Sequence, residues 1–488
     1  MSRRTMSAGA LAMTASLLAA APAAAGGPTV TVPGDYATIQ EAVDAAQNDL
    51  DPGEVIVESD GVFDEPVLIQ ESVTLRAGEG FSPTIEQDGT LVGPLRILAT
   101  EDIDTTVAVV GLTLRLTDGF SVVSISNSNP DVELQVLLER VTIEGHRVGE
   151  GVAVDSGDGD IFLSIEESTV EVVGLPIVGA GEGSSCLRLA PLGFDLSATL
   201  FDSHLRFSRA SGLSARGGDK NDFLGFLALA NVFEGFVSAG FGGFGGIRLA
   251  GSDDPDVDVS FVEVELLSNL LVGTDIAIEA FSILEHQFDL TANNNTIVDS
   301  SSDAVLLVAR DDSEMIASLS NNVVVGPQLR GIEGGDPDGR GIAAEVSDQA
   351  VIDLYNDHNL LFDNFGGAYG GIAMPGPNDV FADPLFVDRG QGDYRLGPGS
   401  PAIDAGDNEP PGGNEAVDLD LGPRIVDGDL DGTETVDIGA YERSAPSVIE
   451  VPALSMPALL AFAGLLAAAA AWRLRRRPAG ARPPSGAG

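Results

Sequence analysis

The sequence has very little cysteine and very little positive charge. Cys186 is the single cysteine among 488 residues, so the chain has no internal disulfide framework. Lys220 is the only lysine, and 25 basic residues face 75 acidic ones, which gives a formal net charge of -50. Seven of the basic residues lie at the two ends of the chain: Arg3, Arg4, Arg473, Arg475, Arg476, Arg477 and Arg482. A body this acidic repels phosphate backbones, which argues against nucleic acid as a partner, and it attracts cations.

Catalytic signatures are also missing. The four histidines share no ligand spacing, and no nucleotide-binding loop or nucleophile elbow is present. Lyase chemistry on a uronic acid needs a basic side chain beside calcium-binding carboxylates, and this chain offers only Lys220 and a scatter of arginines. Acidic pairs that would suit glycoside hydrolysis do occur, but 75 acids produce such pairs by chance.

What the sequence does contain is a repeated pattern of Asn, three apolar or β-branched residues, then Gly or Asp. It begins at Asn269, Asn295, Asn322 and Asn359, so that successive copies are separated by 26, 27 and 37 residues. Asn231 begins an earlier copy. Self-similarity at this period is typical of a repeat architecture.

The repeats predict an all-β, right-handed parallel β-helix. Each copy lies among short β-rich runs separated by Asn, Asp, Ser and Gly, and helical periodicity is missing. In such a fold, equivalent residues of successive coils stack about 4.8 Å apart. The five asparagines are therefore predicted to form a structural hydrogen-bonded ladder with no catalytic role, beside apolar triplets that face the core. At about 28 residues per coil, the solenoid is expected to have roughly ten coils.

The N-terminal part predicts export followed by a cap. Residues 1–25 have the basic start, apolar run and small-residue end of a signal peptide, cleaved between Ala25 and Gly26. Residues 28–80 are interpreted as a cap and first coil, because Thr38 and Glu41 form a capping box before a short amphipathic helix. The helix, the strand Glu54-Val-Ile-Val and the Gly61-x-Phe-x-Glu run together resemble the opening of pectin-lyase-like β-helix proteins. Residues 81–380 hold the coils.

Residues 381–443 resemble the choice-of-anchor Q domain of bacterial surface proteins. The motifs are Asp383-Pro-Leu-Phe-Val-Asp, Gly392-Asp-Tyr-Arg-Leu, Gly399-Ser-Pro-Ala-Ile-Asp-Ala-Gly and Asp437-Ile-Gly-Ala-Tyr-Glu. The resemblance implies a location near an anchoring signal and implies no reaction. Its apolar residues are expected to cover the last coil: Tyr394, Leu396, Ile403, Ile438 and Tyr441.

Within this segment, Asp427-Gly-Asp-Leu-Asp-Gly has the carboxylate spacing of a calcium loop. The twelfth position, which should be acidic, is Ile438, with Asp437 one residue early. Two interpretations follow: a loose calcium site formed by Asp427, Asp429, Asp431 and Asp437, or a solvated acidic turn. Calcium is the one cofactor that the sequence suggests.

The tail predicts an anchor. Residues 444–455 form a linker that ends in Val451-Pro452-Ala453-Leu454-Ser455, residues 456–472 are an uncharged run at the lower limit for a transmembrane helix, and residues 473–488 are basic. The arrangement is similar to exosortase-type sorting signals, and the five-residue motif resembles that of the IPTL-CTERM group. Either a sorting signal that is removed or a permanent single-span anchor fits.

The sequence thus favours an exported, surface-anchored β-helix protein with a structural, adhesive or glycan-binding role and no catalysis. Its expected partners are an extracellular polysaccharide, the export and sorting machinery, and the membrane through the C-terminal helix. The alternative is a polysaccharide-active lyase, hydrolase or esterase. Acids and an arginine converging on one long face of the solenoid, with shifted pKa values, would favour the enzyme.

Overall fold

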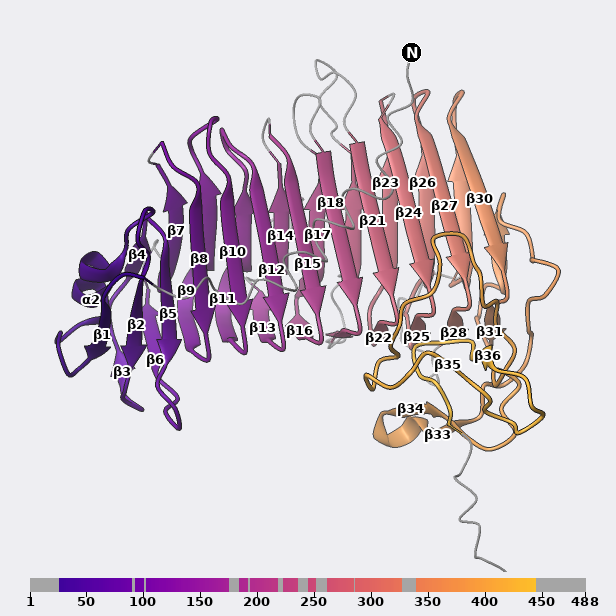
Figure 1. The fold of residues 1–488 in the computed structure, drawn as a ribbon. Coiled ribbons are helices and arrows are strands. Elements are labelled where there is room, and N and C mark those ends of the chain that lie inside the picture. The colour runs from indigo at the N-terminus through magenta and orange to yellow at the C-terminus, as the bar shows by residue number, and fades with distance from the viewer. Residues whose placement is uncertain are drawn as a thin grey trace, which may run out of the picture. The chain divides into compact units, whose positions relative to one another are not determined.

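The chain folds into a parallel β-helix, in agreement with the predicted fold class (Figure 1). The computed structural model describes residues 26–444 apart from 90–92, 101, 175–183, 192–193, 218–222, 236–244, 252–260, 285 and 327–338. Each coil contributes one strand to a long sheet, called sheet A here, and two strands to the other side of the coil, called ladders B1 and B2. Every pairing between coils is parallel.

Sheet A has twelve strands, two more than the roughly ten coils predicted. In spatial order, they are β1 (Thr29–Val32), β2 (Gly53–Val57), β5 (Val73–Ala77), β8 (Thr105–Val110), β10 (Leu134–Glu139), β12 (Ile161–Glu166), β15 (Leu196–Phe201), β18 (Phe223–Leu229), β21 (Phe261–Leu267), β24 (Gln287–Asn293), β27 (Glu314–Ser320) and β30 (Val351–Asp357).

Two long strands, β9 (Thr113–Asn127) and β11 (Thr142–Asp155), bend through both ladders of the opposite side. The other strands of ladder B1 are β3 (Val62–Phe63), β6 (Thr84–Asp88), β13 (Thr169–Gly174), β16 (His204–Ser208), β19 (Val232–Gly235), β22 (Leu270–Val272), β25 (Thr296–Val298), β28 (Val323–Val325) and β31 (Leu360–Phe362). The other strands of ladder B2 are β4 (Val67–Ile69), β7 (Leu95–Ala99), β14 (Ser184–Ala190), β17 (Ala210–Arg216), β20 (Ile247–Ala250), β23 (Ile278–Ser282), β26 (Val305–Ala309), β29 (Ile342–Val346) and β32 (Tyr369–Gly371).

The corner between sheet A and ladder B1 holds the asparagine ladder. Each Asn side-chain oxygen accepts hydrogen bonds from the backbone and side-chain nitrogens of the Asn in the preceding coil, at 2.9–3.1 Å from Asn231 through Asn359. Asp379 ends the ladder by accepting from the Asn359 amide, and Ser203 and Ser168 occupy the same position in earlier coils. The residue before each position has a left-handed backbone, which lets the chain turn sharply there: Arg140, Glu167, Asp202, Ala230, Ser268, Asn294, Asn321 and His358.

The N-terminal end of the core is covered by helix α2 (Ile39–Ala46). The Thr38 hydroxyl accepts a hydrogen bond from the Glu41 amide, as expected for the N-cap of this helix. Ile39, Val43 and their apolar neighbours on α2 are fully buried against the first coil. The expected capping role of this helix agrees with the structure.

The C-terminal module, residues 381–443, covers a side of the last coils and not the end of the core at the last coil. It packs sideways onto the outer face of β22, β25, β28 and β31, where it builds a second core. That core joins Tyr394, Leu396 and Ile438 of the module to residues of the repeats: Leu270, Val298, Val323, Val325 and Leu360. The module contains β33 (Phe386–Asp388), the 3-10 turn η1 (Arg389–Gln391), β34 (Asp393–Leu396), β35 (Ile425–Val426) and β36 (Thr435–Val436).

This lateral packing corrects the interpretation of the apolar triplets. Side chains alternate along a strand, so only the middle residue of each triplet faces the solenoid core: Leu271, Ile297, Val324 and Leu361. The outer residues face the C-terminal module. The end of the last coil is instead approached by the segment after β31, from which Tyr369 and Ala373 pack against the main core.

Several predictions concern residues outside the described ranges. These are the signal peptide with its cleavage site at Ala25, the sorting motif 451–455, the transmembrane run 456–472 and the basic tail. Among the residues that the structure describes, no helix is both long enough and apolar enough to span a membrane.

Candidate functional site

The outer face of sheet A has one outward aromatic residue in each of four consecutive coils. Phe162, Phe201, Phe223 and Phe261 lie on β12, β15, β18 and β21 respectively. Phe223 and Phe261 are direct register partners, and Phe261 is 42% exposed. Because neighbouring strands lie about 4.8 Å apart, Phe223 and Phe261 form a short aromatic stretch across two strands. Phe162 and Phe201 lie two and six residues farther along their strands than this row and are not part of it.

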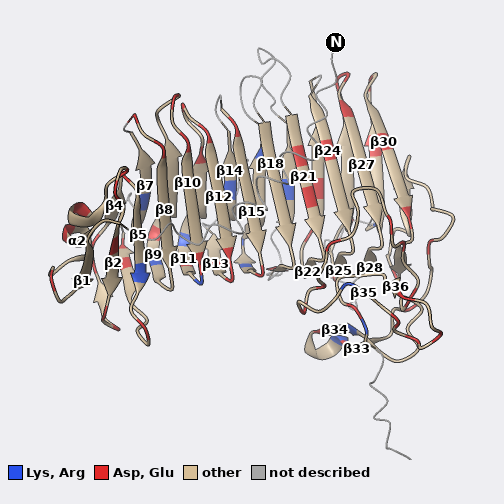
Figure 2. Ribbon diagram, viewed as in Figure 1, with Lys and Arg blue, Asp and Glu red and all other residues tan. Residues whose placement is uncertain are grey.

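Three carboxylates follow the aromatic stretch on the same face. Glu263 of β21 and Asp289 of β24 are register partners, and Glu265 lies two residues farther along β21, so all three point outward. In Figure 2, the acidic residues of β21 and β24 lie side by side. The nine strands of sheet A from β8 to β30 contain no Lys or Arg, so no cation within these sheet A strands neutralises the group.

Burial shifts the ionisation of all three acids. Burial, reinforced by the Glu263 charge, raises the pKa of Glu265 to about 7. Burial also raises the pKa of Glu263, with Asp289 adding to the shift, and that of Asp289, with Glu314 adding to it. Each carboxyl in this group therefore binds its proton more tightly than a free carboxyl does, and Glu265 titrates near neutrality.

A strap from the C-terminal module, residues 410–413, borders this carboxylate group. The carbonyl of Pro411 accepts hydrogen bonds from the Asn293 amide, at 2.9 Å, and from the Ser318 hydroxyl, at 3.5 Å. A Cβ placed on Gly412 would lie 2.8 Å from the Thr291 methyl group, and Thr291 is the register partner of Glu265. The strap thus contacts the register neighbour of Glu265 on the next strand. One Glu265 oxygen, Oε2, is buried and has no hydrogen-bond partner among the described residues.

On ladder B1, outward acidic side chains form ion pairs with arginines. Arg115 lies in register between Glu86 and Glu144 and bonds to both, at 2.9 Å and 2.6 Å. Three coils later the same arrangement recurs with Glu171, Arg206 and Glu234. Acids on this side are thus balanced by arginines in the next coil, whereas those on β21 and β24 are not. The unbalanced group is the better candidate for contact with a ligand.

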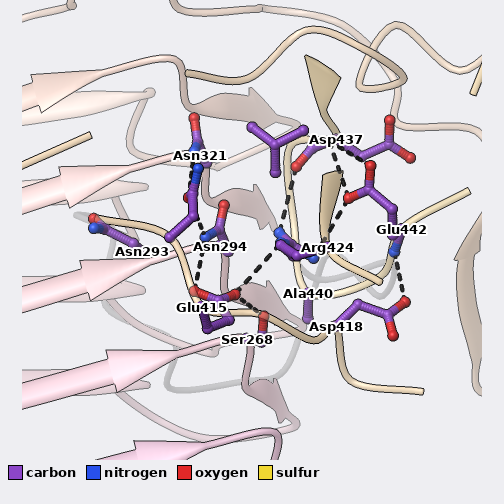
Figure 3. Close-up of polar contacts among 12 residues, drawn as sticks. Ser268, Asn293, Asn294, Asn321, Glu415, Asp418, Arg424, Asp437, Ala440 and Glu442 are labelled. Carbon is purple, nitrogen blue, oxygen red and sulfur yellow. Dashed lines mark hydrogen bonds and ion pairs between the residues drawn. The ribbon is translucent and has the colours of Figure 1, made fainter. Parts of the chain in front are cut away.

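A second polar cluster lies buried where the C-terminal module meets the coils (Figure 3). Arg424 is 1% exposed, and its guanidinium lies 3.4 Å from Glu415 and 3.8 Å from Glu442. Asn294 of the solenoid donates to Glu415 at 3.1 Å. Burial and the neighbouring Asp437 charge raise the pKa of Glu442 to about 9. This cluster joins the module to the coils and is closed to solvent, so its role is structural.

The predicted calcium loop is brought together only in part. Oxygen atoms of Asp427, Asp429 and Asp404 lie within 4.8 Å of one another, at distances suited to a cation. Asp404 was not among the predicted ligands, because it lies far from the loop in sequence. The solvated acidic turn, which was the alternative, fits this arrangement equally well.

Asp431 and Asp437 do not join this group. The Asp437 carboxylate is fully buried, and its oxygens accept hydrogen bonds from the Asp404 and Arg443 amides, both at 2.7 Å. Asp431 accepts from the Thr433 amide at 2.7 Å. Asp437 is thus a buried structural carboxylate, and its inclusion in the predicted calcium site is corrected.

Comparisons with known proteins give one family and several solved structures. A family model described as "Disaggregatase related" matches residues 264–406, less than half of the chain. This range begins in β21 and ends inside the C-terminal module, so it includes Glu265 and Asp289, begins one residue after Glu263, and spans most of the asparagine ladder. No curated protein matches the sequence.

The chain is similar to three β-rich proteins of known structure. The pectate lyase Pel9A has a TM-score of 0.45 and 12% identity, with 86% of this chain and 96% of the lyase covered. The PL6 family alginate lyase AlyGC has a TM-score of 0.34 and 16% identity, with 76% and 57% covered. Tailspike protein 3 of bacteriophage CBA120 has a TM-score of 0.27 and 8% identity, with 66% and 55% covered. At these values the matches assign no substrate to this chain.

Proposed function

We propose that this protein is an exported, surface-anchored β-helix protein that binds an extended polysaccharide along the outer face of sheet A, without catalysis. The observation that carries the proposal is the combination, on one exposed face, of the register partners Phe223 and Phe261 and an unbalanced carboxylate group two residues farther along neighbouring strands. Aromatic rings pack on the apolar faces of sugar rings, and carboxylates accept hydrogen bonds from their hydroxyl groups.

The geometry of a solenoid suits a polymeric ligand. Equivalent positions recur about every 4.8 Å along sheet A, a distance close to the length of one sugar unit. A linear polysaccharide laid across the strands therefore meets a new coil with each sugar. Phe223 and Phe261, as register partners, would contact adjacent sugars. Glu263 and Asp289, two residues farther along β21 and β24 than this row, would lie beside the polymer.

Surface anchoring rests on the two ends of the chain. The signal-like residues 1–25, the resemblance of residues 381–443 to a choice-of-anchor Q domain and the sorting-like tail after Val451 all favour export and attachment at the envelope. The C-terminal module would then hold the solenoid near the anchor while sheet A remains available to the polysaccharide.

A second candidate function, glycoside hydrolysis, is favoured by one specific observation. Glu265, with a pKa raised to about 7, would be protonated often enough to serve as a general acid beside Glu263 or Asp289. Retaining and inverting mechanisms need two carboxyl groups about 5–9.5 Å apart, a range that neighbouring strands provide. No arginine converges on the group from these strands, so binding remains the better-supported function.

The test is a comparison of two phenylalanine variants of the full-length chain. Binding to neutral, uronic-acid and amino-sugar oligosaccharides is measured by calorimetry in a detergent that has no sugar headgroup. Phe261→Ala is expected to weaken binding about three- to tenfold, because a ring contact is lost. Phe120 is 59% exposed on β9, away from sheet A, so Phe120→Ala is the matched control. Equal affinities for both variants, or no binding by the wild-type chain, would refute the proposal.

An assay for new reducing ends distinguishes hydrolysis of the polysaccharide from binding without catalysis. Binding without release of reducing sugar over a day supports the non-catalytic function. Release that is abolished in Glu265→Gln would replace it with hydrolysis. Glu265→Gln keeps the side-chain volume, so loss of activity in a folded variant would reflect loss of the acid.

A further inference from the structure

We infer that the ligand of the sheet A face is a polysaccharide that carries free amino groups, and that Glu263, Glu265 and Asp289 recognise its ammonium groups. This inference rests on the proposed function and names the substrate class of that same face. It is carried by charge complementarity between the ligand and an apolar sheet face on which the charged residues of the described strands beside Phe261 are carboxylates.

The charge on this face has one sign. No Lys or Arg occurs in the nine sheet A strands from β8 to β30, whereas Glu263, Glu265 and Asp289 lie on two adjacent strands of this sheet beside Phe261. On the opposite side of the solenoid, comparable acids are paired with arginines of neighbouring coils, as Arg115 shows. The group on sheet A has no partner of opposite charge within the described strands of that sheet.

A cationic sugar would supply that partner. An ammonium group donates three hydrogen bonds and carries a compact positive charge, and charge-assisted bonds to carboxylates are roughly twice as strong as neutral ones. An ammonium group between the carboxylates of the register partners Glu263 and Asp289 would relieve the repulsion among the three acids.

The same arrangement discriminates against acidic polysaccharides. A uronic-acid polymer would bring carboxylates against Glu263 and Asp289 with no cation between them, and the net charge of -50 adds a general repulsion. Lysine and arginine are the groups that bind a uronate carboxylate, and they are missing from these strands. A sugar whose amino group is acetylated keeps its apolar ring face and loses its charge, so it tests the ammonium contribution alone.

The experiment measures binding of three four-residue oligomers to the purified full-length chain: glucosamine, N-acetylglucosamine and galacturonic acid. Glucosamine oligomers are expected to bind at least tenfold more tightly than the acetylated ones, and galacturonic acid oligomers are expected not to bind. Glu263→Gln and Asp289→Asn should each weaken glucosamine binding about tenfold and leave the acetylated ligand unchanged. Raising NaCl from about 0.05 to about 0.5 M should weaken only the glucosamine complex.

The control for net charge is Asp88→Asn, which removes one negative charge from an exposed position on β6. It is expected to leave glucosamine binding within twofold of wild type. If Asp88→Asn weakens binding as much as Glu263→Gln does, the attraction is general and the inference is overturned. A third outcome separates this inference from the proposed function. If the wild-type chain binds acetylated and free amino oligomers equally well, and Phe261→Ala weakens binding of both, the proposed function stands and this inference fails. If none of the three oligomers binds, both fail.

Discussion

Replacing one rung of the asparagine ladder tests the physical basis of the fold. Asn295 is fully buried in the middle of the ladder. Its side-chain nitrogen donates to Leu266 O at 2.8 Å and to Asn322 Oδ1 at 3.1 Å, and its oxygen accepts from Asn269 N at 3.0 Å and from Asn269 Nδ2 at 3.1 Å. Alanine at this position removes all of these bonds and leaves the surrounding groups in a dry corner.

The cost follows from the groups that lose their partners. Truncation of Asn295 leaves the Asn269 amide without its acceptor and the Leu266 carbonyl without its side-chain donor. A buried polar group left unsatisfied costs about 1–3 kcal/mol, so Asn295→Ala is expected to lower the free energy of unfolding by about 2–6 kcal/mol. Asn295→Asp should cost more at pH 7, because a buried negative charge would face three oxygen acceptors: Leu266 O, Asn293 O and Asn322 Oδ1.

The assay is urea denaturation followed by circular dichroism at pH 7. The control is Asn408→Ala in the C-terminal module, where an exposed side chain donates to Glu434 O at 3.0 Å and accepts from Val436 N at 2.8 Å. Water can replace both bonds there, so a loss of about 1 kcal/mol or less is expected. The reasoning would be refuted if Asn295→Ala were no more destabilised than this control, or if Asn295→Asp were the more stable of the two Asn295 variants.

Three further predictions concern the junction with the C-terminal module and the core. The pKa of Glu442 is raised in the folded chain from 4.5 to about 9, so the folded state retains a proton that the unfolded state releases. The free energy of unfolding should therefore fall as the pH rises from about 4.5 to about 9. In Glu442→Gln, the urea midpoint should decrease less over the same pH range. Gly439, at φ +112, has Val323 2.8 Å from where a Cβ would lie, whereas Gly432, at φ +93, has nothing within 4 Å; thermal melts should therefore show Gly439→Ala more destabilised than Gly432→Ala, and equal shifts would contradict the packing of the module. Cys186 is fully buried and burial raises its pKa, so a thiol reagent should label it in urea and leave it unlabelled in the native chain; fast native labelling would contradict the buried position.

The solenoid could be predicted because the residues that define its turns recur at short, regular intervals in the sequence. A buried turn residue must satisfy its own hydrogen bonds in every coil, and asparagine does so by bonding to its equivalent one coil away. The repeat of Asn269, Asn295 and Asn322 therefore reveals both the period and the direction of stacking. The earlier coils use serine, as at Ser203, which forms fewer such bonds, and the pattern there was too weak to mark the position from the sequence.

The position of the C-terminal module could not be predicted in the same way. Apolar triplets such as Val323-Val-Val325 do signal that both faces of a strand are covered, but the sequence does not say what covers the outer face. That partner comes from residues such as Tyr394 and Ile438, distant along the chain, and the packing depends on contacts rather than on period. Asp404 is likewise distant in sequence from the predicted calcium loop, so the sequence did not indicate that its carboxylate lies beside Asp427 and Asp429.

The carboxylate group was missed although its signal is local. Phe261-Val-Glu-Val-Glu alternates apolar and acidic residues, which indicates that Glu263 and Glu265 share the outward face of a strand. What the alternation does not show is the register with Asp289 or the strap that contacts Thr291, the register neighbour of Glu265. Those depend on which strand lies beside β21 and on where the module turns back.

The central claim, that sheet A presents the ligand-binding face, is tested most directly by hydroxyl-radical footprinting of the full-length chain with and without the oligosaccharide that binds most tightly. The account predicts that the ligand protects Phe223 and Phe261 on β18 and β21, and leaves Phe120 on β9 as reactive as in the free chain. Protection of Phe120 with no change at Phe261, at a ligand concentration that saturates binding, would contradict it.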